Sequence, residues 1–275
     1  MAVITAGCGD DGPSALDAAT STTAASSPSS TATPAPTSTI PGGVERLRAE
    51  VIERHDSDPD VYTQGLELHD GDLYVSGGLY GESSVRIVDP DRGEALHTIE
   101  LDDAFFGEGL TVVDDEVIVL TWKEGTAMVL DAETLDELDR FTYQGEGWGL
   151  CDDGDRLVMS DGSATLQIRD RQTFALRGTV PVTLEDQPLS QINELECVGD
   201  AVWANVWKTD TIVRIDPATG RVTATVDASA LVPPETRSDP GNVLNGIAHD
   251  ERTDTFLITG KRWPALFVVR FVPAG

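Results

Sequence analysis

One stretch of the chain combines residue types that could perform chemistry at a single place. Residues 105–123 read FFGEGLTVVDDEVIVLTWK, with Glu108 between two glycines near the start and Trp122 followed by Lys123 at the end. Two apolar runs separated by an acidic two-residue turn predict an antiparallel hairpin. Because the two ends of such a hairpin are neighbours, we expect the carboxylate, the indole and the ammonium to lie close together. This combination indicates a site rather than a simple turn.

The remainder of the chain repeats this hairpin. Five segments begin with a variable residue that precedes Gly or Glu and then Leu or Ile, at intervals of 44, 40, 45 and 52 residues. The variable residues are Gln64, Glu108, Trp148, Asn193 and Asn245. Short strands separated by turn residues, about four in each unit, predict an all-β fold and a five-bladed β-propeller. Four aspartates that end the third strands are expected to cap turns rather than to act in chemistry, namely Asp89, Asp131, Asp170 and Asp216.

The two ends of the repeat region predict how the ring closes. The last unit, residues 245–272, contains only three expected strands, and an alternating segment at residues 47–52 precedes the first unit. We expect this N-terminal segment to add the missing outer strand to the last blade, since that pairing removes exposed sheet edges. The folded catalytic domain would then cover residues 44–275.

Two positions of the repeat differ between units in a way that packing does not explain. The variable position reads Gln, Glu, Trp, Asn and Asn. A second position, 14 residues later (16 in the last unit), is occupied by Gly78, Trp122, Gly162, Trp207 and Lys261. A repeat that served packing alone would keep one apolar residue at each position. We therefore interpret both sets as parts of one site at a mouth of the central channel.

The first 43 residues differ in composition from the rest. They are rich in Ser, Thr, Ala and Pro and lack Lys, Arg and aromatic residues, so we expect residues 1–43 to form a disordered tether. Cys8 ends the run VITAGC, which resembles the end of a bacterial lipoprotein signal, although the charged start and long apolar region of such signals are missing. Either the start codon lies further upstream or the match is fortuitous. The expected location is extracellular or in the cell envelope, lipid-anchored through Cys8 or released.

The strongly acidic composition excludes several classes of partner. The net charge is −29, and residues 44–275 carry 45 acidic against 19 basic residues, which argues against nucleic acid and anionic membrane surfaces. Lysine occurs only at Lys123, Lys208 and Lys261. Lys123 and Lys208 each follow a tryptophan of the second set, so strand alternation predicts that they point away from it.

The cysteines and histidines give no metal-binding pattern. Cys151 and Cys197 lie in apolar runs, and nothing in the sequence fixes the distance between them, so we expect buried free thiols rather than a disulfide. The four histidines share no metal-ligand spacing. We expect neither a metal nor another cofactor.

Nine motifs, which occur in this order across all five units, resemble the glutaminyl-peptide cyclotransferases of the plant and bacterial type, which are five-bladed propellers. They are YTQGLE, GGLYGESSVR, FGEGLT with LTWK, EGWGL, MSDGS, INELE, ANVWKTD, LNGIAHD and TGKRWP. Together they span about 200 residues. Tyr62 and Cys197 depart from the family pattern, where a Phe and another aromatic residue are expected.

The resemblance implies an acyltransferase that converts the N-terminal glutamine of peptides to pyroglutamate and releases ammonia, and it implies a monomer. The α-amine attacks the carboxamide of its own side chain, so the enzyme must hold that side chain curled and move protons. Glu108, the only acid among the variable residues, is the implied general acid and base. The implied substrate-binding residues are Gln64, Trp122, Trp148, Asn193, Trp207 and Lys261, and Asn245 is added from its place in the repeat alone.

Two other functions fit parts of the same pattern. One is a non-catalytic envelope propeller that binds peptides or cell-wall fragments, against which the intact Glu108 and the tryptophans argue. The other is a metal-dependent propeller lactonase, which needs several carboxylates or histidines converging on the channel, whereas the variable set offers one Glu and two Asn.

Overall fold

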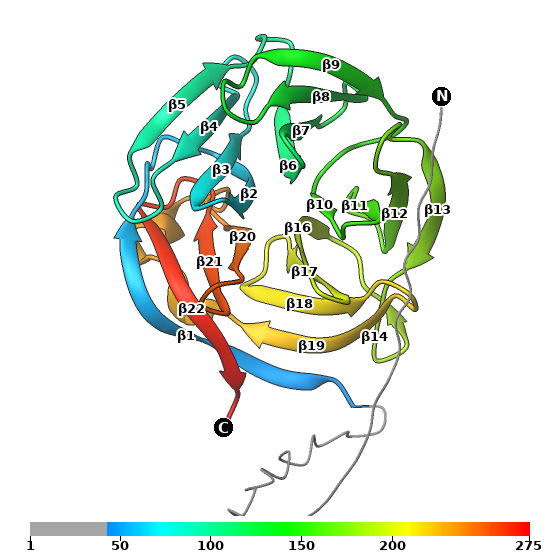
Figure 1. Cartoon of the computed structure of the whole chain (residues 1–275). Helices are drawn as coiled ribbons and strands as arrows, with labels where there is room; N and C mark the ends of the chain where they lie inside the picture. Colours follow the sequence, from blue (N-terminus) through cyan, green and yellow to red (C-terminus); the bar gives the residue numbers. More distant parts are fainter. Residues whose placement is uncertain (1–42) are drawn as a thin grey trace, which may run out of the picture. The chain divides into compact units, whose positions relative to one another are not determined.

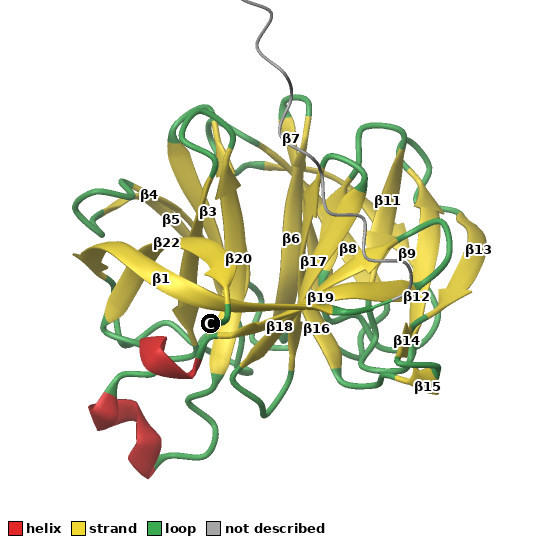
Figure 2. Ribbon diagram, turned by 90° about the horizontal axis from the view of Figure 1, so that it is seen from below, coloured by secondary structure: helices red, strands yellow, loops and turns green. Residues whose placement is uncertain are grey.

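The computed structural model describes residues 43–275, which consist almost entirely of β-strands and connecting turns (Figure 1). The only helical elements among these residues are two 3-10 turns, η1 (Ser229–Leu231) and η2 (Pro234–Ser238), shown in red in Figure 2. The expected all-β class is confirmed. No helix in this part of the chain has the length and apolar character needed to cross a membrane. The predicted tether up to residue 42 and the candidate lipidation site Cys8 lie outside the described residues.

Three of the sheets are separate four-stranded antiparallel meanders, in which each strand pairs with the next one along the chain. The first contains β2 (Thr63–His69), β3 (Asp72–Gly77), β4 (Ser84–Val88) and β5 (Ala95–Glu100). The second contains β6 (Gly107–Val113), β7 (Glu116–Thr121), β8 (Thr126–Asp131) and β9 (Glu137–Thr142). The third contains β10 (Leu150–Asp152), β11 (Arg156–Met159), β12 (Thr165–Asp170) and β13 (Leu176–Pro181).

The remaining strands form one continuous sheet that joins the two ends of the described chain. Its order is β16-β17-β18-β19-β1-β22-β21-β20. The strands are β16 (Ile192–Val198), β17 (Ala201–Val206), β18 (Thr211–Asp216), β19 (Arg221–Asp227), β20 (Leu244–Asp250), β21 (Thr255–Gly260), β22 (Ala265–Pro273) and β1 (Glu45–Asp56), with a small hairpin of β14 (Thr183–Leu184) and β15 (Gln187–Pro188) beside β19. Strand β1 pairs antiparallel with β22 along most of its length and parallel with β19 at its start.

The first strand of every repeat unit lies innermost. In Figure 1, β2, β6, β10, β16 and β20 surround a common centre, and neighbouring members of this ring contact each other, β20 with β2 included. All seven residues of β6 are buried, whereas most of the outer strand β9 is exposed. Apolar runs therefore occupy the inner strands and charged residues the outer ones. The five variable residues all lie at one end of this ring.

The aspartates at the ends of third strands cap turns, as predicted. Asp131 accepts hydrogen bonds at Oδ1 from the backbone N–H groups of Glu133 (3.0 Å) and Thr134 (2.8 Å). Asp89, Asp170 and Asp216 accept backbone N–H bonds in the turns that follow them in the same way. The hydrogen bonds within their own turns engage these carboxylates, which therefore have a structural rather than a chemical role.

Cys151 of β10 and Cys197 of β16 form a disulfide, so the expectation of two free thiols is wrong. The two residues are 46 positions apart in sequence, yet their Cα atoms lie 5.4 Å apart. They come together because β10 and β16 are adjacent innermost strands of different sheets. Lateral contact between sheets is not visible in the spacing of one sequence, which is why the sequence favoured the wrong alternative.

Candidate active site

A pocket of about 260 Å³ opens where the innermost strands begin. Its wall contains seven of the eight residues that the sequence predicted for the site. The lining residues are Tyr62, Gln64, Leu79, Phe106, Glu108, Trp122, Trp148, Asn193, Trp207 and Lys261. Side chains from all five repeat units therefore meet in one pocket.

Asn245, the eighth predicted residue, is not part of the pocket wall. It is fully buried, and its Nδ2 donates to the backbone carbonyls of Thr63 (3.1 Å) and Gln64 (3.3 Å). The same nitrogen lies 3.5 Å from Gln64 Oε1. Asn245 thus holds the first unit against the last one and supports Gln64 from behind.

The strand register changes beside four of the five variable residues. In β6, Gly107 pairs with Thr121 and Leu110 with Val119, so residues 108 and 109 oppose a single residue of β7. Equivalent irregularities occur at the starts of β2, β16 and β20. A bulge of this kind bends the strand and redirects a side chain. In these four strands the bulge coincides with the pattern of a variable residue before Gly or Glu and then Leu or Ile.

Glu108 lies at the end of a short hydrogen-bonded chain of buried side chains. Lys261 Nζ donates to Gln64 Oε1 (2.6 Å), and Gln64 Nε2 donates to Glu108 Oε1 (3.2 Å). The backbone carbonyl of Glu108 accepts a bond from Ser76 Oγ (2.5 Å). The main chain at Glu108 is therefore held firmly, while its carboxylate has only a side-chain amide as a partner within residues 43–275.

The surroundings of Glu108 favour its protonated form. Burial raises the pKa of Glu108 well above its ordinary value, the positive charge of Lys261 opposes this change, and the carboxylates of Glu146 and Glu124 reinforce it. Burial lowers the pKa of Lys261 to about 8, against the opposing effect of Glu108. A buried carboxyl group with a raised pKa is suited to take up and return a proton during a reaction.

Aromatic rings form the walls of the pocket, and glycines make room for them. The rings of Trp148 and Trp207 meet edge to face with centroids 5.4 Å apart. Gly162 has a φ of +77°, and a Cβ atom there would lie 2.6 Å from the ring of Trp148. A Cβ atom at Gly78 would lie 2.4 Å from the ring of Phe106. The glycines of the second set are therefore required by the rings of neighbouring positions.

Lys123 and Lys208 do not point away from the tryptophans, so that prediction is wrong. Lys123 Nζ lies 3.5 Å from the ring centroid of Trp122, and Lys208 Nζ lies 4.2 Å from that of Trp207. Strands β7 and β17 end before these pairs, and Lys208 has a φ of +63°. Strand alternation consequently does not apply there, and each ammonium stacks on the preceding indole.

Three pocket residues, Tyr62, Leu79 and Phe106, were not among the predicted site residues, although Tyr62 was noted as a departure from the family pattern. The ring centroid of Tyr62 lies 4.8 Å from Lys261 Nζ, and that of Phe106 lies 5.4 Å from that of Trp122. Tyr62 and Phe106 each stand two residues before a variable residue. A comparison of that third position between units would have found them. Within residues 43–275, no group of three or more His, Cys, Asp or Glu side chains is placed to hold a metal ion.

Comparisons with known proteins agree with this geometry. The sequence model of a family described as glutamine cyclotransferase matches residues 18–271. A glutaminyl-peptide cyclotransferase of Arabidopsis thaliana is 37% identical over 229 residues, which cover 82% of this chain and 72% of the relative. The crystal structure of Myxococcus xanthus glutaminyl cyclase is similar with a TM-score of 0.79 and 34% identity, and the match covers 85% of this chain and 100% of that one.

Proposed function

The chain belongs to the glutamine cyclotransferase family, and we propose that Glu108 moves the protons in its reaction. The protein is a glutaminyl-peptide cyclotransferase, which cyclises an N-terminal glutamine to pyroglutamate and releases ammonia. The observation that supports Glu108 is its place at the buried end of the pocket, where burial raises its pKa and its carboxylate lacks a backbone partner among the described residues.

The pocket walls restrict the substrate to a reactive conformation. Amine and carboxamide belong to the same residue, so the barrier falls if the side chain is held curled with the two groups in contact. The indoles of Trp122, Trp148 and Trp207 supply apolar surfaces that favour the compact conformer and exclude water. Asn193 carries a buried side-chain oxygen without a hydrogen-bond partner among residues 43–275, and this oxygen is available to an N–H group of the substrate.

Glu108 then carries out both proton transfers, from the α-amine and to the leaving nitrogen. The substrate α-nitrogen bonds to the carboxamide carbon, and one of its protons passes to the Glu108 carboxylate. The tetrahedral intermediate carries its negative charge on oxygen, and Lys261 Nζ, which uses one of its three N–H bonds for Gln64, can donate to that oxygen. The bond to the side-chain nitrogen breaks as Glu108 returns the proton, so that ammonia leaves and the carboxylate is regenerated.

The test is ammonia release from a short peptide that begins with glutamine, measured with and without a chelator. Glu108→Gln keeps an acceptor for Gln64 but removes the proton carrier, so we expect at least a ~1000-fold lower kcat, about 4 kcal/mol of barrier. Glu137→Gln on β9, which changes an exposed carboxylate away from the pocket, is the matched control. Turnover that survives in a folded Glu108→Gln variant would remove Glu108 from this role, and we expect the wild type to resist the chelator.

We propose further that the five sets of strands are the blades of a propeller and that β1 completes the last one. The antiparallel pairing of β1 with β22 between Leu47 and Asp56 supports this proposal, as does the contact of β20 with β2. Deletion of residues 1–42 should leave activity and melting temperature unchanged. Deletion through residue 56 should abolish cooperative unfolding, and a stable truncated protein would argue against closure by β1.

We also propose that the protein works as a monomer in an oxidising compartment, extracellular or in the cell envelope. The disulfide between Cys151 and Cys197 supports this location, because stable disulfides are rare in reducing compartments. The run before Cys8 favours a lipid anchor. Light scattering of the purified protein tests the monomer, and mass spectrometry of the natural N-terminus tests the anchor. An unmodified N-terminus upstream of Cys8 would exclude lipidation.

A further inference from the structure

One carboxylate connects two walls of the pocket. Glu146 lies between β9 and β10, and its Oε2 accepts hydrogen bonds from Trp122 Nε1 (2.7 Å) and from Trp148 Nε1 (3.1 Å). Trp122 follows β7 and Trp148 precedes β10, so the two indoles come from neighbouring sheets. A single oxygen atom thus sets the orientation of both rings relative to each other.

The other oxygen of the same carboxylate is also engaged. Glu146 Oε1 lies 3.6 Å from Lys123 Nζ, the ammonium that stacks on Trp122. The Glu146 carboxylate is therefore bound on both oxygens, by two indole N–H groups on one and by the Lys123 ammonium on the other. An indole N–H is a donor only, and a charged acceptor gives it a stronger bond than a neutral one.

The position of Glu146 in the repeat explains why it is unusual. The residues that stand two positions before the five variable residues are Tyr62, Phe106, Glu146, Gln191 and Val243. In the first two units an aromatic ring at this position contributes directly to the pocket wall. In the third unit a carboxylate replaces the ring and holds two other rings in place.

We infer that Glu146 is a positioning residue for the substrate pocket, which fixes Trp122 and Trp148 through their indole N–H groups; this inference rests on the proposed function of that pocket. Without these bonds the two rings keep their packing contacts but lose the link that fixes their mutual angle. The curled glutamine side chain would then meet a looser wall, and binding and reaction would both weaken.

The experiment compares Glu146→Ala with Glu146→Gln in steady-state ammonia release. We expect Glu146→Ala to lower kcat/KM about 30-fold, with most of the change in KM, because the walls bind the side chain before and during the reaction. The amide oxygen of Glu146→Gln can still accept both indole bonds, so this variant should stay within about threefold of the wild type. Glu137→Ala, which removes an exposed carboxylate that pairs with Arg140, serves as the control.

A second comparison of variants separates the effect of the two indole hydrogen bonds from that of the ion pair between Glu146 and Lys123. Phenylalanine has no N–H group, so in a Trp122→Phe/Trp148→Phe background the addition of Glu146→Ala should change kcat/KM by less than about threefold. Wild-type activity in Glu146→Ala would overturn the inference. Equal losses in Glu146→Ala and Glu146→Gln would overturn it too, because they would point to the charge and its pair with Lys123.

A measurement that does not depend on turnover tests the role of Glu146 separately from the proposed enzymatic activity. Acrylamide quenching of tryptophan fluorescence should increase in Glu146→Ala and not in Glu146→Gln, as the two rings become less ordered. If the wild type released no ammonia, the proposed function would fail while the quenching difference still tested the link between Glu146 and the rings. Unchanged quenching in Glu146→Ala would contradict that link.

Discussion

Buried carboxylates occur at both ends of the ring of innermost strands, in contrasting surroundings. At the site end, defined by the pocket around Glu108, the walls are aromatic and a buried lysine is present. At the acidic end, a polar cavity of about 520 Å³ is lined by Glu67, Thr111, Glu196 and the Cys151–Cys197 disulfide, among others. Opposite ends of the same strands, β2, β6 and β16, supply residues to both sets.

The partners of the carboxylates distinguish the two ends. Glu67 Oε1 accepts the backbone N–H of Val112 (3.1 Å), and Glu196 Oε1 accepts that of His249 (2.9 Å). Each of these glutamates thus binds the backbone of a neighbouring innermost strand. Glu67 joins two separate sheets, and Glu196 of β16 joins the two ends of the large sheet through β20. Glu108 instead accepts a bond from the side-chain amide of Gln64.

This difference shows what makes a buried carboxylate useful for catalysis. Burial raises the pKa of Glu67 to about 7, with the negative charge of Asp152 in support, and raises the pKa of Glu196 and Glu108 well above the ordinary value. A raised pKa is therefore common to both ends and does not identify the site. What identifies it is a carboxylate that faces a pocket beside a buried cation, with no backbone group occupying its oxygens among the described residues.

The largest expected effect concerns the acidic end. Replacing both cysteines, Cys151→Ala with Cys197→Ala, removes a cross-link between residues 46 apart and should lower the free energy of unfolding by about 4 kcal/mol. Because the disulfide lines the cavity away from Glu108, kcat and KM at 25 °C should stay within about twofold of the wild type. Urea denaturation and ammonia release measure the two quantities. A folded double variant with much lower kcat would show that the two ends are coupled.

The next effect concerns the cation of the site end. Lys261→Met removes a donor to the developing oxyanion and should lower kcat/KM about 100-fold, or about 2.7 kcal/mol. It also removes the positive charge that lowers the pKa of Glu108, so that pKa should rise further and the acidic limb of the pH–rate profile should move to higher pH. Profiles of kcat/KM against pH for both proteins check the shift. An acidic limb that moves to lower pH would contradict the assignment of that limb to Glu108.

A third effect tests the raised pKa at the acidic end. The pKa of Glu67 is about 7 in the folded state against an ordinary value of 4.5, so the folded protein binds the proton more tightly than the unfolded chain. The stability that this proton contributes is fully present below pH 4.5 and is lost as the pH rises through 7. Glu67→Gln is neutral at every pH and keeps an acceptor for Val112. We expect it to be more stable than the wild type by about 3 kcal/mol at pH 8 and equal to it at pH 4. Chemical denaturation at the two pH values measures the difference, and a variant less stable at pH 8 would refute the raised pKa.

The sequence could predict the strands and most of the pocket because both follow from local pattern. The variable residue and the small or acidic residue after it mark a bulge at the start of four of the five innermost strands. The starts of all five strands meet at one end of the ring. Asn245 follows the same pattern, yet its amide turns toward the backbone of Thr63 and Gln64, where the last unit meets the first. That contact depends on how the ring closes and not on the local sequence.

The features that the sequence did not predict depend on contacts between sheets or on strand ends. The disulfide joins two sheets laterally, so its spacing of 46 residues carries no signal of proximity. Lys123 and Lys208 lie just beyond their strands, where alternation no longer sets the direction of a side chain. Glu146 was recognisable in principle, because it occupies the position at which other units carry Tyr62 and Phe106, but its two indole bonds require the folded ring.

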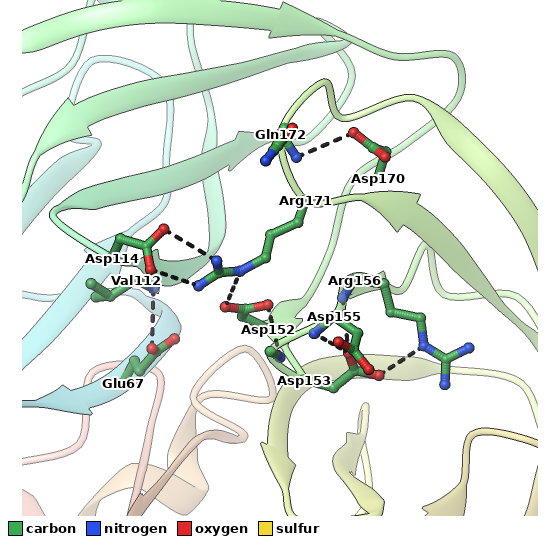
Figure 3. Close-up of polar contacts among 11 residues, drawn as sticks. Glu67, Val112, Asp114, Asp152, Asp153, Asp155, Arg156, Asp170, Arg171 and Gln172 are labelled. Carbon is green, nitrogen blue, oxygen red and sulfur yellow. Dashed lines mark hydrogen bonds and ion pairs between the residues drawn. The ribbon is translucent and has the colours of Figure 1, made fainter.

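The smallest expected effect concerns an ion pair at the acidic end. Arg171 bridges two sheets in Figure 3: its Nε lies 2.8 Å from Asp152 Oδ2, and its two terminal nitrogens each lie 3.1 Å from an oxygen of Asp114. The Arg171 side chain is partly exposed and that of Asp114 is largely exposed, so solvent and salt weaken the interaction.

Arg171→Ala should therefore lower the free energy of unfolding by only about 0.5 to 1 kcal/mol, with no change in kcat or KM. In 1 M salt the difference from the wild type should shrink further, which urea denaturation at two salt concentrations can measure. A loss above about 3 kcal/mol would mean that Asp152 is left as an unpaired, nearly buried charge beside Glu67. In that case the buried carboxylates of the acidic end would need the positive charge of Arg171, as Glu108 at the site end has that of Lys261. Both ends would then rely on a cation, and they would differ in how a substrate reaches the carboxylate.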